Sequence, residues 1–197
     1  DSWTNFKLIF HVLSSKTSEL IYEDEKVSVH TIPLDHRIYT NGFLFKEKPF
    51  ERKLNIQKAE ALNIDKAYFR KLKQGDDVVN EEGTIIPNAE VTFEGHQPKS
   101  YAFCSDTAYK EDIIPVIKDV DVLYHESTFM DAHEYLCAKT KHSTARQAAS
   151  IALKANVKQL ILGHYSTRYG GLEGFKAEAE TVFKNVLLAD DGKEFNF

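Results

Sequence analysis

The pattern of apolar residues changes near position 100, and this change constrains the fold more than any other feature of the sequence. Before it, short β-type segments are separated by turn signals. After it, apolar strands alternate with helical segments: we expect strands at 101–104, 120–124 and 157–162, and helices at 110–118, 144–155 and 172–185. Antiparallel strands followed by strand–helix alternation predict an α/β fold, in which helices cover one face of a mixed sheet.

The expected elements outside this alternation are short. The β-rich first part comprises a strand at 5–13, a hairpin formed by 19–22 and 26–32, and a tight turn at Asn41-Gly42 leading into a strand at 43–46. Two short helices follow at 56–62 and 65–73, and Gly75 is expected to end the second. A last hairpin is expected around Asp190-Asp191-Gly192.

Composition indicates an ordinary globular chain. The 197 residues are 42% hydrophobic, which is enough for the core of one domain. No run reaches the roughly 18 apolar residues of a membrane span, and no basic-then-apolar leader is present, so we expect a cytoplasmic protein without a membrane partner. Cys104 and Cys137 do not form a disulfide framework, which favours a reducing compartment.

Charge is unevenly distributed along the chain. The formal net charge is -5, yet the segment from Lys46 to Lys73 carries nine basic residues against four acidic ones. A basic segment on an acidic body can bind a phosphate backbone. By charge alone, a solvated helical face is an equally good explanation.

Polar side chains with metal-binding capacity follow the ends of expected strands. Asp106 follows 101–104, His164 follows 157–162 through Gly163, and His36 follows the early hairpin. Each has an ordinary alternative, such as a helix cap for Asp106 or a structural role for either histidine. Three such residues at three strand ends favour metal-dependent hydrolysis, because open α/β sheets build their sites there.

Glu126 and His142 suggest acid–base chemistry. We expect Ser143 to be the N-cap of the helix at 144–155, so that the helix dipole disfavours the charged form of His142. A carboxylate such as Glu126 could orient His142 as a proton donor for a leaving oxygen. The alternative is a purely structural hydrogen bond between the two side chains. We interpret the four other histidines as structural: His11, His30, His96 and His133.

Several motifs, taken in order, resemble those of ribonuclease Z, the tRNA 3′-processing endonuclease of the metallo-β-lactamase superfamily. They are Pro33-Leu34-Asp35-His36 running into Gly42-Phe43, Phe103-Cys104-Ser105-Asp106-Thr107, His125-Glu126-Ser127-Thr128-Phe129, the segment from His142 to Ala149, and His164-Tyr165-Ser166-Thr167-Arg168-Tyr169. The resemblance covers the chain from about His30 to Tyr169. It implies an αββα sandwich, of which this chain resembles the second half plus an inserted arm.

The resemblance also implies roles for individual residues. Two zinc ions would be held by His36 on one metal, His164 on the other and Asp106 between them. His142 would be the general acid, with Glu126 supporting it, and Arg168 and Ser166 would contact the substrate phosphate. The substrate would be precursor tRNA, held by a basic arm at 46–75 that includes Arg52, Lys53, Arg70, Lys71 and Lys73. The complete protein would be a homodimer.

Two departures from the family pattern shape these expectations. The H-x-H-x-D-H motif, which supplies most zinc ligands in the family, is absent, so residues 1–197 resemble a single domain that is the C-terminal portion of the enzyme. We therefore expect this chain by itself to be inactive. In the arm, Lys66-Ala67 stands where the family usually has Gly-Pro.

Two other functions remain open at this point. Another metallo-β-lactamase hydrolase, such as a phosphodiesterase or an arylsulfatase, would share the metal residues without needing the arm. A non-catalytic RNA-binding or partner-docking half would also lack the histidine motif. Zinc content separates this last reading from the two enzymes.

Overall fold

The computed structural model describes residues 6–197, which form two compact units. The first, here called the sheet unit, comprises residues 6–22, 29–45 and 100–197. The second, here called the insert unit, comprises residues 23–28 and 46–99. The arm expected at 46–75 thus lies in the insert unit, which continues to Lys99.

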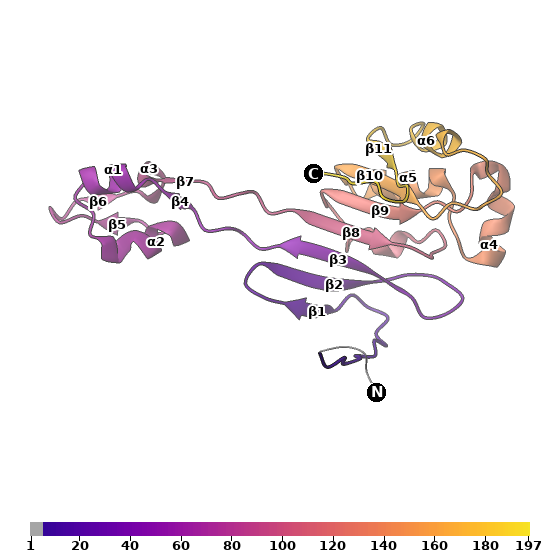
Figure 1. Cartoon of the computed structure of the whole chain (residues 1–197), viewed down its shortest axis with the longest axis horizontal. Coiled ribbons are helices and arrows are strands. Elements are labelled where there is room, and N and C mark those ends of the chain that lie inside the picture. Colours follow the sequence, from indigo (N-terminus) through magenta and orange to yellow (C-terminus); the bar gives the residue numbers. More distant parts are fainter. Residues whose placement is uncertain (1–5) are drawn as a thin grey trace. The chain divides into compact units, whose positions relative to one another are not determined.

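A seven-stranded sheet organises the sheet unit. Its order is β1-β2-β3-β8-β9-β10-β11, formed by Leu20–Glu23, Val27–Pro33, Asn41–Glu47, Ser100–Cys104, Val122–Glu126, Gln159–Gly163 and Val186–Leu188. Strands β8 to β11 are parallel neighbours. Figure 1 shows β1, β2 and β3 as an antiparallel meander beside them. The predicted α/β class with a large mixed sheet is confirmed.

Helices pack on one face of this sheet. Helix α5 (Ala145–Lys154) contacts β9 and β10, and α6 (Glu173–Ala179) contacts α5 and β11 (Figure 1). Helix α5 can pack close to the sheet because the side chains on its inner face are small. Four alanines on this face are fully buried: Ala145, Ala148, Ala149 and Ala152. Short helical segments complete the unit at Glu111–Ile113 (η2), Asp131–Leu136 (η3) and Cys137–Thr140 (α4). No helix in residues 6–197 is long and apolar enough to cross a membrane.

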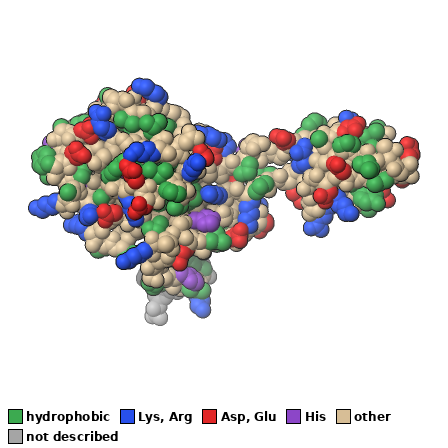
Figure 2. All heavy atoms as spheres, turned by 180° about the vertical axis from the view of Figure 1, so that it is seen from behind, with side chains coloured by type: hydrophobic (Ala, Val, Ile, Leu, Met, Phe, Trp, Pro, Cys, Tyr) green, Lys and Arg blue, Asp and Glu red, His purple; other side chains and the backbone are tan. Residues whose placement is uncertain are grey.

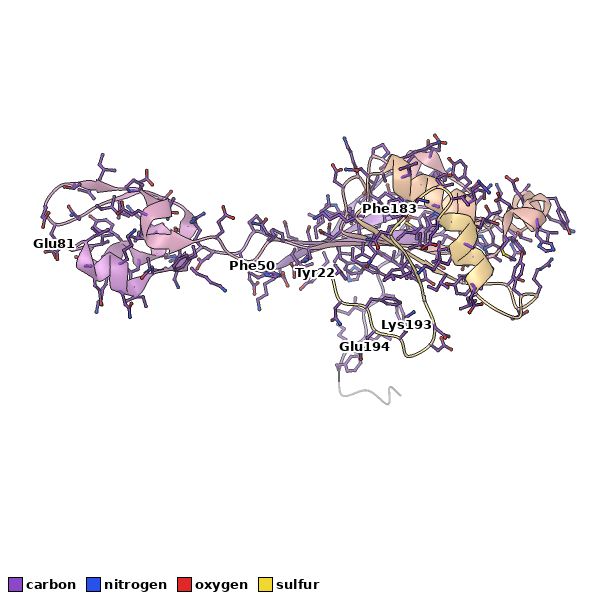
Figure 3. All side chains as sticks on the ribbon, turned by 90° about the horizontal axis from the view of Figure 1, so that it is seen from above. Tyr22, Phe50, Glu81, Phe183, Lys193 and Glu194 are labelled. Carbon is purple, nitrogen blue, oxygen red and sulfur yellow. The ribbon has the colours of Figure 1, made fainter. Side chains whose placement is uncertain are left out.

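The two faces of the parallel strands carry different side chains. Leu123, Leu160 and Leu162 are fully buried in the main core with α5 and α6. The opposite face is aromatic, and the rings of Phe103 and Tyr124 stack there with centroids 4.8 Å apart. A cavity of about 360 Å³ on that face is lined partly by the C-terminal segment that includes Lys193, labelled in Figure 3.

Two expectations for the first part of the chain are wrong. Residues 6–13 form no strand, and Asn5 lies outside the described residues. Phe10 and Val12 are 83% and 93% exposed. Within residues 6–197 this segment neither pairs with a strand nor packs into a core, so its apolar pattern alone does not form a strand. Asn41-Gly42 is not a turn but the start of β3. A Cβ on Gly42 would lie 2.2 Å from the Phe103 carbonyl oxygen, so the glycine permits close approach of β8.

Expectations for the second part also needed correction. The helix expected at 110–118 is reduced to η2, because Pro115 cannot continue a helix. Helix α6 ends at Ala179 rather than 185. The last hairpin is replaced by β11, which pairs in parallel with β10 and buries Val186. Thr144, not Ser143, is the N-cap of α5 and forms a capping box with Gln147.

The insert unit has a small core of its own. Its elements are β4 (Lys53–Leu54), α1 (Ile56–Ala61), η1 (Lys66–Tyr68), α2 (Phe69–Gln74), β5 (Val78–Val79), β6 (Ile85–Ile86), α3 (Asn88–Val91) and β7 (Thr92–Phe93). They enclose Ala59, Leu72 and Val91, all fully buried. Gly75 ends α2 with a left-handed φ of 101°, as expected. Figure 3 labels Glu81 in the turn between β5 and β6.

Candidate active site

Three adjacent parallel strands deliver the central residues of the candidate site. Asp106 follows β8, Glu126 ends β9 and His164 follows β10. Ligand atoms of Asp106, His142 and His164 all lie within 4.8 Å of one another, and His164 Nε2 is 3.0 Å from Asp106 Oδ1. Asp106 and His164 have left-handed φ values of 60° and 57°. Such backbone is uncommon outside glycine and is often found at functional sites.

Glu126 is a fully buried carboxylate surrounded by donors. Its Oε1 accepts from His142 Nδ1 at 2.7 Å and from the Thr107 backbone N–H at 2.9 Å. Its Oε2 accepts from the Thr128 hydroxyl at 2.7 Å and from the backbone N–H groups of Thr128 and Ser143. Burial by itself would raise the pKa of Glu126, but the hydrogen bonds from His142 and Thr128 together lower it below the usual value. The five donors around its oxygens and the lowered pKa both favour the anionic form of Glu126.

His142 lies in the segment that precedes α5. The hydrogen bond to Glu126 raises the pKa of His142 above its usual value, and this outweighs the opposing effect of burial. The expectation that the helix dipole disfavours the charged form is therefore wrong in its net effect, because a carboxylate in direct contact is the stronger influence. His142 is held by its Nδ1, and its Nε2, which has no hydrogen-bond partner among residues 6–197, is available to meet a metal or a substrate.

His36 lies beside the three-residue group but outside it. Its ring centroid is 5.2 Å from that of His142, and its Nδ1 is 3.0 Å from the Lys141 carbonyl oxygen. Lys141 has a left-handed φ of 61°. None of His11, His30, His96 and His133 belongs to a potential metal-binding group within residues 6–197.

The donors in this group suit zinc. Imidazole nitrogen and carboxylate oxygen are both common zinc ligands. His36, His142 and His164 each have Nδ1 within hydrogen-bond distance of an oxygen, from Lys141, Glu126 and Thr128 respectively. An anchored Nδ1 leaves Nε2 for the metal, which is the usual arrangement of a ligating histidine. The residues present therefore fit a zinc site, although their individual roles stay predictions.

Arg168 and Ser166 lie close to each other in the loop that follows β10. The Arg168 guanidinium lies 5.3 Å from the centroid of the Phe129 ring, and its Nε is 3.3 Å from Ser166 Oγ. Phe129 in turn lies edge-on to His142, with centroids 6.4 Å apart. A guanidinium oriented by the ring that also contacts the candidate acid is suited to bind a phosphate.

The insert unit gathers most of its predicted RNA-binding residues around one cavity. Arg52, Lys53, Arg70 and Lys73 line a space of about 850 Å³ together with Phe69. Lys71 is not part of that lining. Within the described part of the chain, these five cations form no ion pair, whereas three other lysines of the insert unit do: Lys48 with Glu23, Lys58 with Glu90 and Lys66 with Glu60. Figure 2 shows basic side chains exposed on the surface of this unit.

Sequence reasoning did not identify Thr107, Thr128 or the Ser143 backbone as partners of Glu126. Thr107 and Ser143 act through backbone N–H groups, which leave no signature in the sequence. Thr128 had a signal, since its hydroxyl follows Glu126 by two residues after a strand end.

Comparison with solved structures identifies the fold. Human tRNase Z (short form) aligns with 89% of this chain and 45% of its own, with a TM-score of 0.52 and 21% identity. A long-form RNase Z from yeast gives a TM-score of 0.55 over 86% of this chain and 18% of its own, at 19% identity. A metallo-β-lactamase fold protein from Bacillus subtilis gives 0.57 over 89% and 51%, at 15% identity. The chain has the metallo-β-lactamase fold, as expected.

Sequence relatives narrow the class further. Ribonuclease Z of Parabacteroides distasonis is 42% identical over 187 residues, which is 95% of this chain and 62% of that protein. Ribonuclease Z of Cytophaga hutchinsonii is 44% identical over 191 residues, which is 96% and 61%. The chain is thus a relative of ribonuclease Z, as its motifs predicted, and spans about three fifths of the length of these proteins. No family model matches the sequence.

Proposed function

We propose that this chain is part of a zinc-dependent endoribonuclease that removes the 3′ trailer of precursor tRNA. The observation that carries the proposal is the meeting of Asp106 and His164, which follow the parallel strands β8 and β10, with His142, which precedes α5, in a chain 42% identical to a ribonuclease Z. His36, Asp106 and His164 would hold the metal, and zinc would supply Lewis-acid chemistry at the phosphodiester. The complete protein would act as a homodimer.

The protein's own side chains would perform the remaining steps. His142, whose pKa is raised by its hydrogen bond to Glu126, would carry a proton on Nε2 and give it to the departing 3′ oxygen. Glu126 would stay anionic and keep the ring in place. Arg168 and Ser166 would bind the phosphate and orient it for cleavage. The cation-lined cavity of the insert unit supports a polyanionic substrate over a small ester.

The zinc content of this chain tests the metal assignment. Because His36, Asp106 and His164 are too few ligands for two closed zinc sites, we expect the 197-residue chain to bind zinc weakly or not at all. A version extended upstream with an H-x-H-x-D-H motif should bind about two zinc ions per chain. Elemental analysis after gel filtration measures both. Tight, stoichiometric zinc in the 197-residue chain would contradict this assignment.

Neutralising the insert cations tests the substrate. Changing Arg52, Lys53, Arg70, Lys71 and Lys73 together to glutamine in the extended protein should raise KM for precursor tRNA and flatten the salt dependence of binding, because fewer counterions are released. Hydrolysis of a model phosphodiester should change little, since the candidate active site is untouched. A matched control changes the ion-paired Lys48, Lys58 and Lys66 to glutamine, with a smaller expected effect. Equal losses on both substrates would show that the five cations support folding instead.

A further inference from the structure

The Thr128 hydroxyl lies between the two functional parts of the candidate site. Its Oγ1 is 2.7 Å from Glu126 Oε2 and 2.8 Å from His164 Nδ1. Thr128 is 7% exposed and Glu126 is fully buried, so water does not compete freely for these contacts. We propose that Thr128 is a positioning residue that fixes His164 with Nε2 directed at the metal, and that it does so by connecting the ring to Glu126.

The direction of these hydrogen bonds follows from counting protons. A threonine hydroxyl has one proton to donate, and a carboxylate can only accept. Since Glu126 Oε2 also accepts from the backbone N–H groups of Thr128 and Ser143, it acts as an acceptor, and the hydroxyl donates to it. The remaining bond can form only if His164 Nδ1 carries a proton and donates it to the threonine oxygen. The neutral ring is thereby restricted to the tautomer that has a bare Nε2.

This tautomer explains the contact between His164 and Asp106. In the neutral ring with this tautomer, Nε2 and Asp106 Oδ1 both present lone pairs at 3.0 Å from each other. A cation that both atoms bind would stabilise this arrangement. The inference therefore rests on the proposed metal site and adds to it a residue that prepares one ligand.

Glu126 would consequently serve two histidines through its two oxygens. Its Oε1 holds His142 directly, and its Oε2 holds His164 through Thr128. The candidate acid and a candidate ligand thus depend on one buried charge. The backbone keeps the same loops together independently of the hydroxyl, because Ser166 N–H donates to the Thr128 carbonyl and Ser127 N–H to the Gly163 carbonyl. Removing the hydroxyl should therefore leave the loops in place.

Substitution of Thr128 by valine and by serine tests the inference. Valine keeps the shape and removes the hydroxyl, whereas serine keeps the hydroxyl. In the metal-free chain, nitrogen-15 NMR of the histidine rings at a pH of about 8.5, where free histidine is neutral, should show His164 protonated at Nδ1 in the parent and in Thr128→Ser. In Thr128→Val it should show a mixture of tautomers. Ser127→Ala is the matched control and should leave the tautomer unchanged, since the buried Ser127 hydroxyl bonds, within the described chain, to the Gly163 carbonyl alone.

Zinc affinity gives a second readout in the extended protein. By chelator competition, Thr128→Val should bind zinc about 10- to 100-fold more weakly, as is typical when a ligand loses its outer partner, while Thr128→Ser and Ser127→Ala should stay close to the parent. An unchanged tautomer in Thr128→Val, or failure of serine to restore it, would overturn the inference. If the parent binds no zinc, the proposed function fails, and the NMR comparison still decides the role of Thr128.

Discussion

Replacing His142 with alanine in the extended protein should lower the rate of precursor tRNA cleavage by about 10²- to 10⁴-fold, the usual contribution of a general acid. Zinc content should remain that of the parent. The physical reason is that the hydrogen bond to Glu126 favours protonation of His142, and a protonated ring donates to a leaving group but does not bind a metal.

This experiment distinguishes a proton donor from a metal ligand. The ligand atoms of His142, Asp106 and His164 lie within 4.8 Å of one another, so the position of His142 alone would also permit metal binding. Zinc is therefore measured on the same preparations as activity. Loss of zinc from His142→Ala would show that the residue is a ligand, and the proton-donor role would be wrong. Arg146→Ala is a control for general damage near α5. Arg146 lies in the first turn of this helix, and its exposed side chain pairs with Asp131 of η3.

Replacing Glu126 with glutamine should destabilise the chain by about 3–5 kcal/mol, the typical result of removing one partner from a buried ion pair. Five donors surround the carboxylate. The glutamine side chain replaces one accepting oxygen by an NH2 group, so at least one of these donors would lose its acceptor. The free energy of unfolding in urea near neutral pH measures the effect. Glu111→Gln is the control, because its exposed pair with Lys154 should contribute little.

The stabilisation by Glu126 should also depend on pH in a defined direction. The pKa of Glu126 is lowered on folding, so its stabilisation is present above the ordinary carboxyl pKa and is lost as the pH falls through the lowered value. Glu126→Gln should therefore lose this acid-dependent part of its unfolding free energy. An equal fall in stability with acid in both proteins would contradict the assignment of Glu126 as a buried anion.

Much of the candidate site could be predicted because local sequence determines where strands end. Asp106, Glu126 and His164 lie at or just after apolar segments, and parallel neighbours bring such ends to one edge. Gly75 likewise ended its helix as its position predicted. Predictions failed where a segment's state depended on distant partners. Residues 6–13 have a strand-like pattern but no partner strand in the described structure, and Val186–Leu188 became a strand because β10 lay beside it.

The sequence by itself determined the α/β class and the similarity to ribonuclease Z. Both follow from properties of the chain alone, which are the periodicity of its apolar residues and the order of its motifs. Only the tertiary structure decided the electrostatics of the site. The direction in which the pKa of His142 shifts depends on Glu126, a carboxylate 16 positions away along the chain. The fold buries this carboxylate and surrounds it with backbone donors. The place of Thr128 between Glu126 and His164 was decided in the same way, since a hydroxyl's partners depend on which loops the sheet brings together.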